Sequence, residues 1–258
     1  MRPTILMMIV LLAMTACGGD GRSEGQEPDE TKAASSSNPQ SSSPSAGAQH
    51  TTAQDSNAQG NTRAQASESA SFKVVMLGDS LTAGFGLPPE AALPEQLEKW
   101  FRAKGEDIEF INAGVSGDTT AGGLARYDFS VRAVDPDLLI IALGANDFLN
   151  GLDASIARDN LSEIISNARD DAVPVVLFGL MSRSQNSLRE SEFANMINGL
   201  SEEYKIPLYS EFLASVQDKP ELLQPDGLHP TADGVIAVAD ETAQFLQPIV
   251  AELLQEKG

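Results

Sequence analysis

Residues 138–143 (LLIIAL) decide the fold class, because this run is wholly apolar and Gly144 follows it directly. Strands at the centre of a parallel sheet are buried on both faces and therefore read as continuous apolar runs. Four further candidate strands are spaced along the chain, at residues 72–77 (FKVVML), 107–112 (DIEFIN), 173–178 (VPVVLF) and 206–209 (IPLY). The chain is therefore predicted to contain a five-stranded β-sheet.

Apolar residues at helical spacing separate these runs and follow the last of them. The main helical stretches are residues 94–105, 156–165, 193–204 and 235–253, the last with an expected kink near Pro248. Strands that alternate with helices favour parallel pairing, because each crossover helix returns the chain to the same edge of the sheet. We therefore expect an α/β domain with three αβα layers around a five-stranded parallel sheet.

The composition limits where this domain can lie. Residues 18–70 contain no Ile, Leu, Val, Met, Phe, Tyr or Trp. Such a segment cannot bury enough apolar surface to offset the entropy of ordering it. We therefore expect a disordered tether rich in Ser, Gly, Gln and Ala over residues 18–70, and one folded domain over residues 71–258.

Charge and cysteine content exclude several classes of function. The formal net charge of the 258 residues is −20 at pH 7, and so acidic a chain repels nucleic acids and anionic lipid surfaces. Cys17 is the only cysteine, and His229 is the only histidine outside the tether. A domain with one His and no Cys is poorly equipped to bind a metal, so neither a metal nor a cofactor is expected. No feature indicates oligomerisation, and a monomer is expected.

Residues 1–17 predict export. Arg2 precedes an apolar run over residues 5–14, which is too short to span a bilayer but suits the core of a signal peptide. The run ends in Met14-Thr15-Ala16-Cys17, which resembles a bacterial lipoprotein signal. The resemblance implies lipidation of Cys17 and anchoring in the cell envelope, with the periplasmic face of the outer membrane favoured because no Asp follows the cysteine. An ordinary secretory signal is the alternative.

Polar turns follow the predicted strands, where parallel αβα sheets bind their ligands. The first turn is Gly78-Asp79-Ser80-Leu81, which places a serine hydroxyl at a helix start, where negative charge is stabilised. The second turn contains Gly117, which can present a bare backbone N–H to a ligand. Each also has a purely structural explanation, as a helix cap in the first case and a tight turn in the second.

Two later turns add an amide and an imidazole. Asn146 follows the most apolar strand, and its amide could donate to a developing oxyanion or simply form an Asx turn. Asp226 precedes His229 by three residues, so its carboxylate can reach Nδ1 and fix the tautomer of the ring, although a surface His beside a helix cap is the alternative. Together the four turns supply a nucleophile, a base, a group that orients the base, and oxyanion donors.

The four turns resemble the four sequence blocks of the SGNH (GDSL) hydrolases, in the same order and over nearly all of residues 72–254. The resemblance implies the flavodoxin-like SGNH hydrolase fold, with Ser80 as nucleophile, His229 as general base and then acid, and Asp226 orienting His229. It also implies an oxyanion hole made by the backbone N–H groups of Ser80 and Gly117 and the side chain of Asn146. Asp79 and Asp147 are then supports rather than catalysts.

The pattern is most similar to a bacterial periplasmic subgroup with thioesterase, lysophospholipase and arylesterase activities, in which the sequence Gly-Leu-Ala-Arg of residues 123–126 also occurs. The segment from Met181 to Asn186 departs from this subgroup, which has an apolar, proline-containing stretch there. The resemblance implies a serine esterase that acts on small-molecule or lipid carboxylic esters or thioesters through an acyl-enzyme.

Two other functions remain open at this point. Related hydrolases remove acetyl groups from carbohydrate or peptidoglycan, but Phe85 and the pair Phe148-Leu149 near the expected site suit aryl or lipid acyl chains better. A flavodoxin-like module that binds a nucleotide is disfavoured, because neither G-x-x-x-x-G-K-[ST] nor G-x-G-x-x-G occurs in the chain.

Overall fold

The computed structural model describes residues 72–179 and 188–257. The predictions for the signal sequence, for lipidation of Cys17, for the tether over residues 18–70 and for the segment from Met181 to Asn186 lie outside these residues.

Five parallel strands form one sheet in the order β2-β1-β3-β4-β5, which confirms the predicted α/β class. The strands are β1 (Phe72–Gly78), β2 (Ile108–Gly114), β3 (Leu138–Ala142), β4 (Val175–Phe178) and β5 (Leu208–Tyr209). From β1 the chain adds β2 on one side and then crosses back to add β3, β4 and β5 on the other side. Ligands of such sheets bind at the carboxyl ends of the strands where this change of side occurs, here between β1 and β3.

Three strand boundaries differ from the prediction by two residues, and the others agree to within one. β2 extends two residues further than expected, because it stays in register with β1 as far as the pair Gly78 and Gly114. β4 and β5 begin later than expected, and each follows a proline, Pro174 and Pro207 respectively. Each proline carbonyl still accepts a hydrogen bond from the neighbouring strand, but proline has no N–H with which to extend the ladder.

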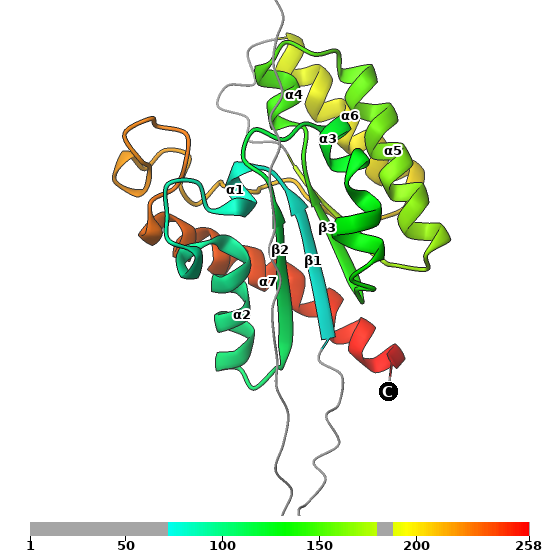
Figure 1. The fold of residues 1–258 in the computed structure, drawn as a ribbon. Helices are drawn as coiled ribbons and strands as arrows, with labels where there is room; N and C mark the ends of the chain where they lie inside the picture. The colour runs from blue at the N-terminus through cyan, green and yellow to red at the C-terminus, as the bar shows by residue number, and fades with distance from the viewer. Residues whose placement is uncertain (1–71, 180–187, 258) are drawn as a thin grey trace, which may run out of the picture. The chain divides into compact units, whose positions relative to one another are not determined.

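Seven α-helices occur in the described part of the chain, and they are shown in Figure 1. They are α1 (Ser80–Ala83), α2 (Leu93–Ala103), α3 (Thr120–Ala125), α4 (Ala145–Leu149), α5 (Ala154–Asp170), α6 (Leu188–Tyr204) and α7 (Ala232–Lys257). Short 3₁₀ helices lie at Pro89–Ala91 and Pro220–Leu222, and a π-helical turn lies at Asp128–Arg132. The sequence did not reveal α3 and α4, because both are too short to show an apolar period.

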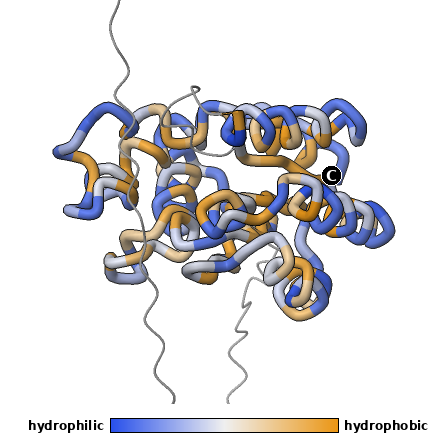
Figure 2. Tube along the Cα trace, turned by 90° about the horizontal axis from the view of Figure 1, so that it is seen from above, coloured by the Kyte–Doolittle hydropathy of each residue, from blue (hydrophilic) through white to orange (hydrophobic). Residues whose placement is uncertain are grey.

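The sheet separates two hydrophobic cores. Val74 and Met76 of β1 face α2 and α7, whereas Val75 and Leu77 face α5 and α6. This alternation follows from the two-residue period of a strand, and it places helices on both faces of the sheet (Figure 1). Seen from above, hydrophobic positions lie mostly toward the interior and hydrophilic ones along the outer turns (Figure 2). Among the helices described, none is long and apolar enough to cross a membrane.

Candidate active site

All five residues predicted to form the site line a single pocket of about 490 Å³. Ser80, Gly117 and Asn146 reach it from the loops that follow β1, β2 and β3. Asp226 and His229 reach it from the segment that precedes α7, rather than from a turn directly after β5. The structure therefore brings together residues that the sequence places in four separate segments.

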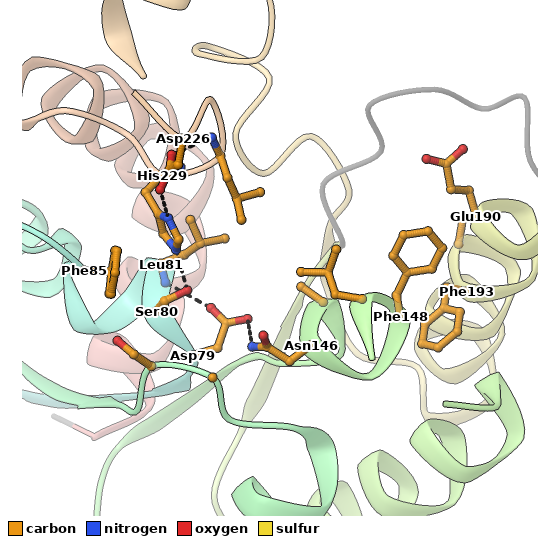
Figure 3. Close-up of a pocket in the computed structure, with 16 residues that line it drawn as sticks. Asp79, Ser80, Leu81, Phe85, Asn146, Phe148, Glu190, Phe193, Asp226 and His229 are labelled. Carbon is orange, nitrogen blue, oxygen red and sulfur yellow. Dashed lines mark hydrogen bonds and ion pairs between the residues drawn. The ribbon is translucent and has the colours of Figure 1, made fainter. Parts of the chain in front are cut away.

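A chain of short contacts links Ser80, His229 and Asp226 (Figure 3). The Oγ atom of Ser80 lies 2.9 Å from Nε2 of His229, and Nδ1 of the same ring lies 2.7 Å from Oδ2 of Asp226. An ionised Asp226 can only accept, so Nδ1 carries the proton and the lone pair of Nε2 faces the serine hydroxyl. The arrangement can deprotonate Ser80 as its oxygen attacks an electrophile.

The second oxygen of Asp226 holds the turn that carries His229. Oδ1 accepts hydrogen bonds from the backbone N–H groups of Leu228 (2.8 Å) and His229 (3.0 Å). The hydrogen bond from the imidazole, followed by these two backbone bonds, lowers the pKa of Asp226 to about 2. Asp226 therefore stays negatively charged at any ordinary pH, although 40% of its side chain is exposed.

Ser80 stands at the start of α1 because Asp79 caps that helix. Oδ1 of Asp79 accepts a hydrogen bond of 3.0 Å from the N–H of Leu81. Asp79 is only 3% exposed, and this burial raises its pKa to about 6. Gly78 permits the tight strand-to-helix turn, because a Cβ atom there would lie 2.0 Å from Oγ1 of Thr82.

Gly117 and Asn146 face the same space as Ser80. Gly117 has φ +83°, a conformation that favours glycine, in a turn closed by a hydrogen bond from the N–H of Asp118 to the carbonyl of Val115. The Nδ2 group of Asn146 donates to the carbonyl of Asp118 at 2.9 Å and to Oδ2 of Asp79 at 3.3 Å. The longer contact, to Asp79, is the one that a substrate oxygen could replace.

Asp147 does not line the pocket and is fully buried. Its two oxygens accept from the N–H of Thr120 at 2.8 Å and from Oγ1 of Thr120 at 2.6 Å. Oγ1 of Thr120 in turn accepts from the amide of Asn160 at 3.0 Å. This network joins α4, which carries Asn146, to α3 and α5. Thr120 and Asn160 were not predicted from the sequence, because neither lies in one of the four motifs.

Apolar side chains form most of the remaining wall of the pocket (Figure 3). They are Leu81, Phe85, Phe148, Leu149, Phe193 and Leu228. The ring of Phe85 packs on the imidazole of His229, with the ring centroids 4.5 Å apart. Phe148 and Phe193 meet edge to face on the side away from Ser80, with centroids 5.6 Å apart. The pocket can therefore accept an apolar group next to the serine hydroxyl.

Within residues 72–179 and 188–257, no group of three or more His, Cys, Asp or Glu side chains is arranged to hold a metal ion.

Comparison with known proteins connects this geometry to a family. Residues 76–235 match the model of the GDSL-like Lipase/Acylhydrolase family. An arylesterase of Vibrio mimicus is 37% identical over 182 residues, which cover 70% of this chain and 91% of that protein. Thioesterase 1/protease 1/lysophospholipase L1 of Escherichia coli K12 is 31% identical over 182 residues, 70% of this chain and 86% of that protein.

Solved structures agree with the sequence relatives. The crystal structure of AlinE4, an esterase of the SGNH-hydrolase family, superimposes with a TM-score of 0.58 at 38% identity. The match covers 71% of this chain and 97% of AlinE4.

Proposed function

Because the chain belongs to the GDSL-like lipase/acylhydrolase family and is a serine ester hydrolase, we propose that Ser80, His229 and Asp226 are its catalytic residues. The observation that carries this proposal is the continuous contact from Ser80 Oγ through the imidazole of His229 to the carboxylate of Asp226. All three groups come from one chain, so a monomer suffices for the reaction.

In the proposed reaction, Oγ of Ser80 attacks the carbonyl carbon of the ester while its proton passes to Nε2 of His229. The negative charge of Asp226 stabilises the imidazolium that results. When the tetrahedral intermediate collapses, Nε2 returns the proton to the departing alkoxide or thiolate, and the acyl group stays on Ser80. A water molecule that gives its proton to Nε2 then attacks the carbonyl carbon of the acyl group. When this second tetrahedral intermediate collapses, the bond to Oγ breaks, Nε2 returns the proton to Oγ of Ser80, and the acid is released.

The oxyanion of both tetrahedral intermediates would be stabilised by the N–H groups of Ser80 and Gly117 and by Nδ2 of Asn146. The start of α1 supports the first donor, since helix N-termini favour negative charge, and the open surroundings of Gly117 support the second. The third requires Asn146 to exchange its 3.3 Å contact with Asp79 for the substrate oxygen.

The substrate class we propose is an ester or thioester with an aryl or medium-to-long acyl chain, including lysophospholipids. The apolar wall that continues from Phe85 and Leu81 to Phe148 and Phe193 supports this choice, because burial of a longer chain there yields more free energy than burial of an acetyl group. The relatives named above as arylesterase and lysophospholipase support the same class.

We also propose that the enzyme is exported and anchored at the periplasmic face of the outer membrane through a lipid on Cys17. The support is the sequence of residues 1–70 alone: an apolar run ending at the cysteine, followed by a long polar segment. Metabolic labelling with an alkyne-tagged fatty acid, compared between the native chain and Cys17→Ala, tests the anchor.

Hydrolysis of p-nitrophenyl esters from acetate to palmitate tests the activity. Ser80→Ala should abolish turnover, whereas Ser116→Ala, which alters another serine of the same pocket, should retain most of it. A maximum at medium or long chains supports the proposed substrate class, and a sharp maximum at acetate would favour a carbohydrate O-acetyl esterase. Turnover that survives in Ser80→Ala would overturn the catalytic assignment.

A further inference from the structure

Arg126 makes contacts that the proposed reaction does not explain. It follows α3, and its side chain is only 18% exposed. Its Nε donates to Oδ2 of Asp118 at 2.8 Å, and one terminal nitrogen donates to the carbonyl of Gly78 at 2.9 Å. The other terminal nitrogen lies 3.3 Å from Oγ of Ser130. One guanidinium thus connects the ends of β1 and β2 to the chain that follows α3.

Each main acceptor of Arg126 lies within two residues of a proposed oxyanion donor. Gly78 lies two residues before Ser80, and Asp118 directly follows Gly117. The backbone carbonyl of Asp118 also accepts from Nδ2 of Asn146 at 2.9 Å. Arg126 is therefore connected to all three donors, although it does not line the pocket itself.

The turn that carries Gly117 has few other supports. A Cβ atom placed on Gly117 would meet nothing within 4 Å, so packing around that residue does not hold the turn. One backbone hydrogen bond, from Val115 N–H to the carbonyl of Gly78 at 3.0 Å, links the turn to the end of β1. The ion pair between Asp118 and Arg126 supplies a second link to the same carbonyl.

The carboxylate of Asp118 is closely packed against its neighbours, which restricts it to one position. A Cβ atom on Gly122 would lie 1.7 Å from Oδ1 of Asp118, so any side chain there would displace the carboxylate. The carboxylate is 12% exposed and is held between the backbone of α3 and the guanidinium.

We propose that Arg126 is a positioning residue that sets the spacing of the oxyanion hole, an inference that rests on the proposed function. It fixes the turn of Gly117 relative to the end of β1 and, through Asp118, the orientation of Asn146. An oxyanion hole stabilises charge only when its donors are preorganised, and errors of about 1 Å in a catalytic site cost on the order of 100-fold in rate. A planar guanidinium can hold two acceptors in fixed directions, which an ammonium cannot.

The variant Arg126→Lys tests this role, because it keeps the positive charge but loses the planar guanidinium that donates to two acceptors in fixed directions. We expect kcat on p-nitrophenyl butyrate to fall about 10- to 100-fold, less than the roughly 10²- to 10³-fold loss expected when a donor is deleted. KM should change less than about threefold, because the donors act mainly on the transition state. The matched control is Arg132→Lys, since Arg132 pairs with Asp171 and does not contact these turns.

A phenylboronic acid inhibitor separates positioning from a merely structural role. Oγ of Ser80 forms a bond to the boron atom while the serine proton moves to His229. In the tetrahedral adduct, one boronate oxygen occupies the oxyanion hole. In Arg126→Lys its inhibition constant should rise by the same factor by which kcat falls, whereas a protein that is only less stable would keep both values per folded molecule. Unchanged kcat, or a loss confined to KM, would overturn the role of Arg126.

Asp118→Asn gives a second measurement if the lysine variant does not fold. It keeps an acceptor atom for Arg126 and removes only the charge, so a smaller loss of kcat is expected, again with weaker boronic acid inhibition. Parallel assays of the native chain and Ser80→Ala keep the two proposals apart. If turnover is lost in Ser80→Ala but unchanged in both Arg126→Lys and Asp118→Asn, only the role of Arg126 is overturned. If turnover persists in Ser80→Ala, the catalytic assignment is overturned.

Discussion

The Oγ atom of Ser80 lies 2.9 Å from Nε2 of His229, although the two residues are 149 positions apart in the sequence. Ser80 follows β1, and His229 precedes α7. Val235 and Val238 of α7 pack in the same core as Val74 and Met76 of β1, which brings the loop before α7 to the carboxyl end of β1 (Figure 1). The packing of one helix on one strand thus brings the proposed base to the proposed nucleophile.

Asp226→Asn should lower kcat by about 10²- to 10⁴-fold while the protein stays folded. The asparagine can fill the same space, but it no longer stabilises the imidazolium or imposes the Nδ1–H tautomer. Because the pKa of Asp226 is about 2, the native carboxylate is ionised at every assay pH from 5 to 9, so the deficit should persist across that range.

Steady-state kinetics and thermal unfolding check this prediction. Asp153→Asn, which alters an acidic cap of α5, is the control and should keep its activity. Near-native turnover in Asp226→Asn would argue against Asp226 as the residue that orients His229.

Asp79 should make the protein more stable in mild acid than at neutral pH. Its pKa is raised from 3.8 in the unfolded chain to about 6 in the fold, so between these values the folded state binds a proton that the unfolded state has released. Stability from this group is therefore fully present below about pH 4 and is lost as the pH rises through about 6. The difference in pKa corresponds to about 3 kcal/mol.

Urea unfolding of the native chain and of Asp79→Asn at several pH values between 4 and 7 isolates this contribution. The variant keeps an acceptor for the N–H of Leu81 but cannot titrate. The free energy of unfolding of Asp79→Asn, relative to that of the native chain, should increase as the pH rises from 4 to 7. A difference that does not change with pH would contradict the prediction.

Asp147→Ala should destabilise the fold by roughly 2–4 kcal/mol, because it leaves the buried N–H and hydroxyl of Thr120 without their acceptors. It should also lower kcat per folded molecule, since α4 carries Asn146 and loses its connection to α3. Denaturant unfolding measures the loss of stability. Steady-state rates divided by the concentration of active sites, obtained by active-site titration, measure the loss of kcat. Asp159→Ala, on the exposed side of α5, should change stability by less than about 0.5 kcal/mol.

Ala194→Trp should shift the acyl-chain preference toward short esters. Ala194 is exposed and lines the pocket beside Phe193, so a large ring there narrows the apolar end without disturbing the core. We expect kcat/KM to fall about 10- to 100-fold on p-nitrophenyl decanoate and to change little on acetate.

The neighbouring substitution Asn195→Trp is the control for this prediction, because Asn195 lies on the same helix but does not line the pocket. Equal losses on decanoate and acetate in Ala194→Trp would show that the acyl chain does not occupy this end of the pocket.

The strands that matter most for the site were predictable, because β3 is buried throughout and β1 is buried at every residue except Lys73, so both read as short apolar runs. The starts of β4 and β5 were not, since Pro174 and Pro207 each extend an apolar run without the N–H that a ladder needs. The motifs also identified the five residues proposed to form the site, all of which line the pocket. They did not show that Asn146 contacts Asp79, or that Arg126 joins Gly78 to Asp118, because these partners come from different loops.

The sequence by itself determined the α/β class, the acidic character and which side chains are available for chemistry, because hydrophobic period and residue type are local properties. Only the tertiary structure decided which of those side chains meet. The distance from Ser80 to His229 depends on the packing of α7 on the sheet, and the pKa of Asp79 depends on its burial beneath the pocket. The shape of the apolar wall depends on how α4 and α6 bring Phe148 and Phe193 together. Such distances and burials arise from contacts between segments far apart in the chain, which no local pattern records.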